Sequence, residues 1–143
     1  MSISSRTANG GVPMVVEAGG GSAFDETVDM AVENTLNVMK HLKMIEGELV
    51  LPERQIFVNN YVVYRSVTGG YYLAEPEIKL GAEVKKGQVL GRVIDPLTSE
   101  EREVTRSPVN GIIISRRIKM PINPGGYIVH IADTDSIIWE REG

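Results

Sequence analysis

The stretch Gly87-Gln88-Val89-Leu90-Gly91-Arg92-Val93-Ile94-Asp95 decides the fold, because a similar stretch recurs as Gly125-Gly126-Tyr127-Ile128-Val129-His130-Ile131-Ala132-Asp133. A shorter pair, Gly70-Tyr71-Tyr72-Leu73 and Gly111-Ile112-Ile113-Ile114, precedes the two copies. Internal similarity of this kind is typical of repeated supersecondary units. The repeat predicts two similar hairpin units that form a small sandwich or barrel with quasi-two-fold symmetry, in which both halves bury alternate residues.

Around the repeat, from Ile56 onward, short apolar runs alternate with Gly and Pro, which predicts an all-β region. Residues 61–67 are predicted to form a strand that turns at Thr68-Gly69-Gly70 and pairs with a strand at residues 71–74. Further strands are predicted at residues 88–94, 103–106, 111–116 and 127–132, and residues 137–139 are expected to cover a sheet edge.

A long helix is predicted upstream, at residues 25–44, because apolar residues recur there at spacings of three and four. These residues are Val28, Val32, Leu36, Met39 and Leu42. Gly47 is expected to end the helix. Burial of each such side chain is worth about 1.5–3 kcal/mol, so we expect this face to pack against the β-region or to drive self-association.

One carboxylate, Glu17, ends a short apolar run and is followed by three glycines. Val15 and Val16 favour a buried strand, and the glycines allow a sharp turn or a close approach to a ligand. A partly desolvated carboxylate has a raised pKa and suits proton transfer. A glutamate paired with a lysine, or hydrogen-bonded to the loop, explains the same pattern without catalysis.

Composition restricts the classes of function. The 143 residues include 15 basic and 19 acidic side chains, so the net charge of −4 argues against nucleic acid as the main partner. There is no cysteine, which excludes disulfides, thiolate metal sites and cysteine nucleophiles. No stretch has the length of a membrane span and the first residues do not resemble a signal peptide, so a cytoplasmic protein without a membrane partner is expected.

The segment from Leu80 to Asp133 resembles a biotinyl/lipoyl-type barrel-sandwich domain. The matching motifs are Leu80-Gly81-Ala82-Glu83-Val84-Lys85-Lys86-Gly87-Gln88-Val89-Leu90-Gly91 and Ser107-Pro108-Val109-Asn110-Gly111. In the carrier proteins of this type, a modified lysine lies on the hairpin between the two motifs, whereas residues 95–102 here include no lysine. Lys119 stands in a sequence similar to a biotin-attachment site, but it follows the second motif, so it is interpreted as an ordinary surface lysine.

The whole chain resembles the C-terminal part of the succinylglutamate desuccinylase/aspartoacylase family, which is related to zinc carboxypeptidases. Three features occur in the family's order: the run from Val12 to Gly21, the helix ending Leu36-Asn37-Val38-Met39-Lys40-His41-Leu42, and the appended β-domain. The resemblance implies an α+β fold, in which residues 1–46 are one strand and one long helix from the end of an α/β zinc-hydrolase domain. Residues 47–55 are then a linker, and residues 56–143 are a small all-β barrel-sandwich domain.

The chemistry that this resemblance implies is hydrolysis of an N-acyl amino acid or a related amide. In the family, a zinc-bound water is the nucleophile and the metal polarises the carbonyl. The strand-end glutamate, here Glu17, takes the water proton and passes it to the leaving amine. An upstream arginine, here Arg6, is expected to hold the substrate carboxylate; a solvated side chain near the N-terminus is the alternative interpretation.

The family's zinc ligands are two histidines and a glutamate, and the first two occur as His-x-x-Glu. This chain has only His41 and His130, and neither has a glutamate three residues later. Both are interpreted as structural histidines, and the side chain of His130 is expected on the strand face opposite Val129 and Ile131. We therefore expect no metal to bind to this chain alone, and we expect it to need an upstream catalytic domain or subunit.

Three functions stay open. The first is the C-terminal portion of a zinc-dependent deacylase that carries the general acid/base but not the zinc ligands, either as a fragment or as one subunit of a split enzyme. The second is a stand-alone, non-catalytic β-module for assembly or small-ligand binding. The third is a biotin or lipoate carrier, against which the missing hairpin lysine argues.

Overall fold

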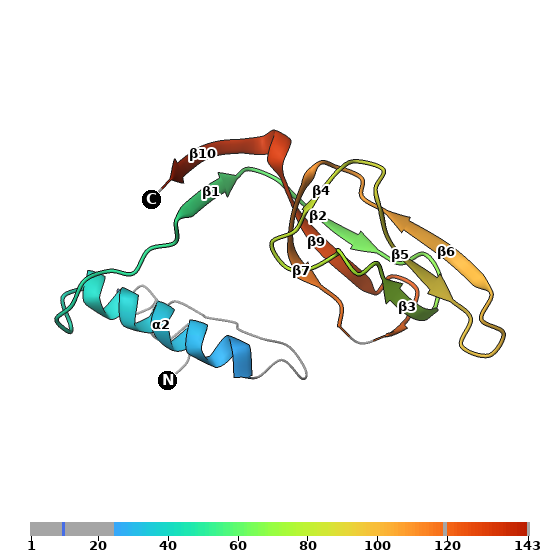
Figure 1. Ribbon diagram of the computed structural model, residues 1–143, viewed down its shortest axis with the longest axis horizontal. Coiled ribbons are helices and arrows are strands. Elements are labelled where there is room, and N and C mark those ends of the chain that lie inside the picture. The colour runs from blue at the N-terminus through green and yellow to red at the C-terminus, as the bar shows by residue number, and fades with distance from the viewer. Residues whose placement is uncertain (1–9, 11–24, 119, 143) are drawn as a thin grey trace. The chain divides into compact units, whose positions relative to one another are not determined.

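The computed structural model describes residue 10, residues 25–118 and residues 120–142, and the chain divides into two compact units, Met1–Leu51 and Pro52–Gly143 (Figure 1). The first unit contains helix α2, Asp25–His41, which confirms the predicted helix. The segment after α2 is tied back to it, because the Asn37 side chain donates to Val50 O at 2.6 Å and accepts from Val50 N at 3.0 Å.

Helix α2 ends three residues earlier than predicted, and Gly47 does not end it. Met44 N donates to Met39 O and Lys43 N donates to Lys40 O, both at 2.9 Å, which is the hydrogen-bond pattern of a Schellman motif. Lys43 occupies the left-handed position of this motif with φ of 56°. The prediction of a glycine stop was wrong because a lysine adopts the conformation that usually selects glycine.

The second unit is built from strands that form two four-stranded sheets, β2-β9-β7-β4 and β6-β5-β3-β8, and a two-stranded ribbon, β1-β10; all the pairings are antiparallel. The strands are β1 Arg54–Val58, β2 Tyr61–Arg65, β3 Gly70–Ala74, β4 Glu83–Val84, β5 Val89–Ile94, β6 Glu101–Arg106, β7 Gly111–Arg116, β8 Pro121–Ile122, β9 Tyr127–Asp133 and β10 Ile137–Glu142, with the 3₁₀ turn η1 Thr134–Ser136 before β10. Within the described ranges, no helix has the length and apolar character needed to cross a membrane.

The predicted repeat relates the two four-stranded sheets. Exchanging β2, β9, β7 and β4 for β6, β5, β3 and β8 converts the strand order of one sheet into that of the other. Matching hydrogen bonds support this relation, because Ser66 O accepts from Gly125 N at 2.8 Å and Ser107 O accepts from Gly87 N at 2.7 Å. The predicted quasi-two-fold arrangement is therefore confirmed.

Two glycines that begin equivalent strands allow the neighbouring backbone to approach closely. A Cβ on Gly70 would lie 2.3 Å from Ile94 O, and a Cβ on Gly111 would lie 2.2 Å from Ala132 O. Ile94 and Ala132 are equivalent positions in the long repeat. The same close approach therefore explains the first glycine of both copies of the short repeat.

Apolar residues of both sheets fill one core. Leu90 and Val93 of the first copy are fully buried, and so are the equivalent Ile128 and Ile131 of the second. The other buried members of this cluster are Tyr72, Ile78, Val84, Ile113, Ile122 and Val129. Both copies thus contribute buried residues to the core at equivalent positions.

The predicted hairpin between β2 and β3 does not form. Strand β2 pairs with β9, and β3 pairs with β5 and β8, so the turn at Thr68-Gly69-Gly70 carries the chain from one sheet to the other. A Gly-Gly turn is compatible with a hairpin and with a crossover, and contacts distant in sequence decide between them.

Candidate functional site

The site residues predicted from the sequence, Glu17 and Arg6, lie outside the described residues, and so does Lys119. The structure therefore neither brings Glu17 and Arg6 together nor separates them. The polar clusters that it does describe in the β-unit include those around Glu103, Tyr72, Arg92 and Asp95.

Glu103, on β6, binds the turn that joins the two sheets. Its Oε2 accepts hydrogen bonds from the backbone N–H groups of Val67 and Thr68, both at 2.9 Å, and from Thr68 Oγ1 at 3.1 Å. Ser66 Oγ lies 2.9 Å from the same oxygen. The other oxygen, Oε1, is buried and has no hydrogen-bond partner among the described residues. Hydrogen bonds from the turn thus occupy Oε2 of this carboxylate. We interpret Glu103 as a structural residue that holds the turn, and not as a proton-transfer group.

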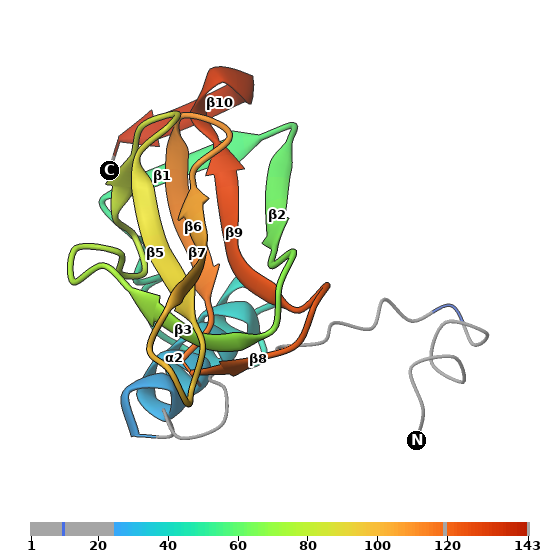
Figure 2. The same cartoon turned by 90° about the vertical axis from the view of Figure 1, so that its right-hand side faces the viewer.

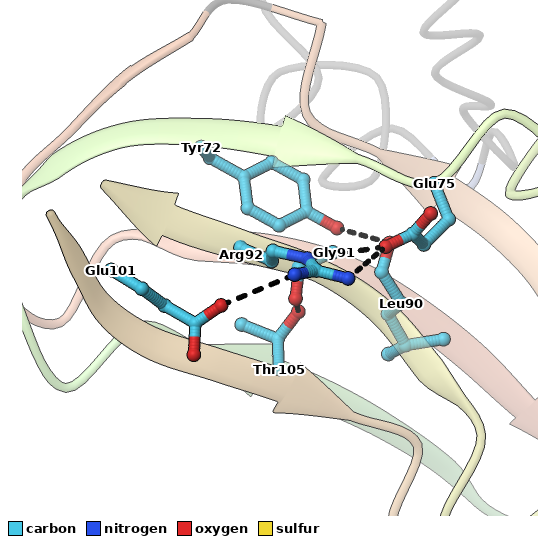
Figure 3. A network of polar contacts seen from close by, with 7 residues as sticks. All are labelled: Tyr72, Glu75, Leu90, Gly91, Arg92, Glu101 and Thr105. Atoms are coloured by element: carbon cyan, nitrogen blue, oxygen red, sulfur yellow. Dashed lines mark hydrogen bonds and ion pairs between the residues drawn. The ribbon is translucent and has the colours of Figure 1, made fainter. Parts of the chain in front are cut away.

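A buried polar network joins β3, β5 and β6 (Figure 3). Tyr72 OH donates to Leu90 O at 2.9 Å, and Thr105 Oγ1 donates to Gly91 O at 2.9 Å. Burial raises the pKa of Tyr72 to about 12, which keeps the phenol neutral. A Cβ on Gly91 would lie 2.7 Å from Tyr72 OH, so the tyrosine ring needs a glycine beneath it. These groups satisfy one another and offer no ligand site.

An exposed ion-pair network adjoins these buried groups. Arg92 Nε lies 3.5 Å from Glu75 Oε1, and Arg92 Nη1 lies 3.3 Å from Glu101 Oε2; dashed lines in Figure 3 mark the contacts of Arg92 with both glutamates. All three side chains are partly or largely solvent-exposed, and exposed pairs of this kind contribute about 0–1 kcal/mol. These ion pairs therefore contribute little to the stability of the sheet. We interpret them as surface contacts and not as a catalytic site.

The hairpin between β5 and β6 is held in shape by Asp95. Its Oδ1 accepts from Leu97 N at 2.7 Å and from Thr98 N at 3.1 Å, and its Oδ2 is paired with Arg102. The two backbone N–H groups, and then Arg102, hold the pKa of the Asp95 carboxyl below its usual range. Leu97 stands at the tip, 93% exposed, and residues 95–102 contain no lysine. The hairpin thus has a fixed shape without an amine group.

His130 lies where the sequence predicts it. Val129 and Ile131 are fully buried, while the half-buried His130 projects from the opposite face of β9. Its ring centroid is 5.3 Å from that of Tyr127 and 6.3 Å from that of Tyr61. Aromatic packing therefore accounts for this histidine.

The described part of the chain does not fit a zinc site. It contains no group of three His, Cys, Asp or Glu side chains that could hold a metal ion. His41 is exposed in the last turn of α2, and His130 lies between tyrosines. Neither histidine has the neighbours that a tetrahedral zinc site needs.

Sequence reasoning missed Glu103. Its hydrogen-bond partners lie more than thirty residues upstream, in a turn that looks like part of an ordinary hairpin. One difference between the two copies of the repeat could have indicated its role. The turn after β2 has Val67, whereas the equivalent turn after β6 has Pro108, which has no N–H to donate. The first turn has an N–H at this position, from which Glu103 of the other copy accepts a hydrogen bond, and the second turn has none there.

Comparison with known proteins identifies relatives among deacylases. No family model matches the sequence. The chain is 32% identical over 121 residues to the N-alpha-acetyl-L-2,4-diaminobutyric acid deacetylase of Halomonas elongata. The match covers 80% of this chain but 34% of the relative, so the chain spans about a third of the length of that curated protein.

Solved structures extend the similarity to the fold. The product-bound ectoine utilization protein EutE (DoeB) from Ruegeria pomeroyi matches 94% of this chain and 42% of its own, with a TM-score of 0.74 and 27% identity. A succinylglutamate desuccinylase from a Silicibacter species matches 89% of this chain and 40% of its own, with a TM-score of 0.71 and 24% identity. The second likeness concerns the fold alone.

Proposed function

This chain belongs to the succinylglutamate desuccinylase/aspartoacylase family, and we propose that it is the C-terminal portion of an enzyme that hydrolyses N-acyl amino acids in the cytoplasm. The observation that carries the proposal is the match to the Ruegeria ectoine utilization protein. That match extends over 94% of the chain, so it includes both the helix and the β-unit in one order. The curated relative, whose name gives N-acetyl-diaminobutyrate as its substrate, supports the same class of reaction.

In this proposal, Glu17 accepts and donates the proton, and Arg6 binds the substrate carboxylate. A glutamate at the end of a buried strand is partly desolvated, which raises its affinity for a proton and suits this role. A guanidinium matches the geometry of a carboxylate and binds it through two hydrogen bonds. Both assignments rest on the resemblance of the segment around Glu17 to the family.

We propose that the zinc ligands come from another part of the protein or from another subunit. The sequence has two histidines and no cysteine, and among the residues that the structure describes neither histidine belongs to a group that could hold a metal. The curated relative is about three times as long as the segment that it shares with this chain, so it has room for the ligands elsewhere. This chain alone is accordingly expected to be inactive.

The β-unit is proposed to be a barrel-sandwich module of the biotinyl/lipoyl type, without the carrier function. The quasi-two-fold relation between its two sheets supports this fold, and the lysine-free hairpin around Leu97 argues against a covalently bound cofactor. A stand-alone assembly module is the second candidate, because residues 52–143 form a compact unit with a core of their own.

One experiment separates these functions. An antibody against the β-unit is used to isolate the native protein from its own cells, and the intact mass, zinc content and hydrolysis of N-acetyl amino acids are measured. We expect a species about two to three times the mass of this chain, or a complex with a second subunit, that contains zinc and hydrolyses the substrates. A metal-free, inactive species with the mass of this chain would establish the assembly module instead, and added mass of biotin or lipoate would establish a carrier.

A further inference from the structure

Strand β2 is an edge strand with unused backbone groups. It stands at the end of the order β2-β9-β7-β4, and Figure 2 shows it beside β9 at the margin of that sheet. Asn60 O accepts from Asp133 N at 3.1 Å, and Ser66 N donates to Gly126 O at 2.9 Å. Backbone groups alternate in direction along an antiparallel strand, so residues 61, 63 and 65 point theirs away from β9. Within the described ranges, no strand pairs with that outer side of β2.

The equivalent edge strand, β6, is protected against pairing, whereas β2 is not. Strand β6 reads Glu-Arg-Glu-Val-Thr-Arg, with four charged residues of six, and Glu103 turns its carboxylate toward the Ser66–Thr68 turn. Strand β2 reads Tyr-Val-Val-Tyr-Arg, with one charged residue at its end. Charged side chains on edge strands are the usual protection against edge-to-edge association. One of the two equivalent edge strands therefore carries this protection, whereas the other consists mostly of aromatic and β-branched residues.

The sequence of β2 is complementary to itself. In an antiparallel pair of two β2 strands centred on Val63, each Val63 faces its own copy, and Tyr61 of one strand faces Arg65 of the other. This register places the outward backbone groups of residues 61, 63 and 65 opposite one another, so that all of them pair. It also places Arg65, whose Nη1 donates to Gly125 O of its own chain at 2.9 Å, on the same side of the paired strands as the exposed ring of the partner's Tyr61.

We propose that β2 is an interface between two copies of this chain, in which two β2 strands pair antiparallel about Val63 and join two four-stranded sheets into one. The interface is isologous, as in most homodimers, because the same strand serves both copies. It depends on backbone hydrogen bonds and on contacts of the exposed Tyr61 and the half-buried Val63. It does not depend on deacylase activity.

The absence of cysteine from the chain gives a direct test. In the proposed register the two Val63 Cα atoms lie about 5.5 Å apart, within the range that a disulfide bridges. The full chain carrying Val63→Cys is oxidised mildly, and its dimer is quantified on a non-reducing gel. The matched control is Val104→Cys, at the equivalent position of β6, where Val104 pairs with Arg92 as Val63 pairs with His130.

We expect Val63→Cys to form a disulfide-linked dimer at least about tenfold faster than Val104→Cys at the same concentration. Equal rates, or a Val63→Cys chain that stays monomeric, would overturn the proposal. If either cysteine variant fails to fold, sedimentation of Val63→Lys against Val104→Lys decides the matter. Dimerisation weakened at least about tenfold by Val63→Lys alone supports a β2 interface, and equal dimerisation of the two lysine variants rejects it.

Discussion

Glu103, on β6, accepts a 2.9 Å hydrogen bond from the backbone N–H of Thr68, in the turn between β2 and β3. The same oxygen accepts from Val67 N, so one carboxylate satisfies two consecutive N–H groups of a segment that crosses between the sheets. The equivalent turn around Pro108 lacks one of these donors. The two copies of the repeat thus have equivalent strands, but among the described residues only the turn after β2 is bound by a carboxylate in this way. We call the hydrogen bonds from Val67 N and Thr68 N to Glu103 the Glu103 clamp.

Glu103→Gln is expected to lower the free energy of unfolding by about 1–3 kcal/mol, as measured by urea denaturation. The substitution keeps the shape but removes the charge that strengthens the hydrogen bonds, and it places an amide group where the buried Oε1 lacks a partner. The control is Glu101→Gln on the same strand, which loses an exposed pair with Arg92 and should cost no more than about 1 kcal/mol. If both variants lowered the free energy of unfolding equally, the hydrogen bonds of Glu103 would contribute no more to stability than an exposed ion pair.

Gly111→Ala is expected to destabilise the protein by about 3 kcal/mol, because its Cβ would lie 2.2 Å from Ala132 O in the adjacent strand. Gly70→Ala, at the equivalent position, should have a similar effect. The control is Gly125→Ala, whose Cβ would meet no atom within 4 Å and whose cost is the left-handed φ alone, about 1–2 kcal/mol. Thermal unfolding of the three variants gives the order, and a Gly125→Ala variant as unstable as Gly111→Ala would contradict the close-approach argument.

The repeat predicted the quasi-two-fold fold because the two halves need glycines and buried residues at equivalent positions. The sequence shows this as the same residue types recurring at the same spacing. Leu90 and Ile128 show how directly such spacing translates into a shared core. The connection from β2 to β3 was not predictable, because Thr68-Gly69-Gly70 permits two paths and Glu103 favours the crossover from 35 residues away. Lys43 shows the same limit at short range, since a lysine ended the helix where the sequence favoured Gly47. The assignments of Glu17 and Arg6 remain predictions from the resemblance to the family.

Stability is expected to fall between about pH 10 and pH 12, in part because Tyr72 must stay neutral in the fold. Its pKa is about 12 in the folded chain and 10.0 without burial. The unfolded chain therefore loses the Tyr72 proton first as pH rises, and unfolding is favoured by up to about 2 kcal/mol. Burial raises the pKa of Tyr64 in the same direction.

Tyr72→Phe should reduce this alkaline loss while lowering stability at pH 7 by about 1 kcal/mol, since the hydrogen bond to Leu90 O disappears. Urea denaturation at several pH values measures both effects. Tyr71→Phe, an exposed neighbour on β3, is the control and should leave the alkaline loss in place. An unchanged loss in Tyr72→Phe would place the responsible groups elsewhere.

Glu17→Gln, made in the complete enzyme that contains this chain, is expected to lower kcat at least about 100-fold, because a glutamine keeps the shape of the side chain but cannot accept the proton. The zinc content of the enzyme should stay unchanged, which separates loss of the base from loss of the metal. Glu33→Gln, an exposed glutamate on α2, is the matched control and should leave kcat within about twofold. A normal kcat in Glu17→Gln would remove Glu17 from the mechanism, whereas a fall in kcat together with loss of zinc would make it a residue that holds the metal site in place.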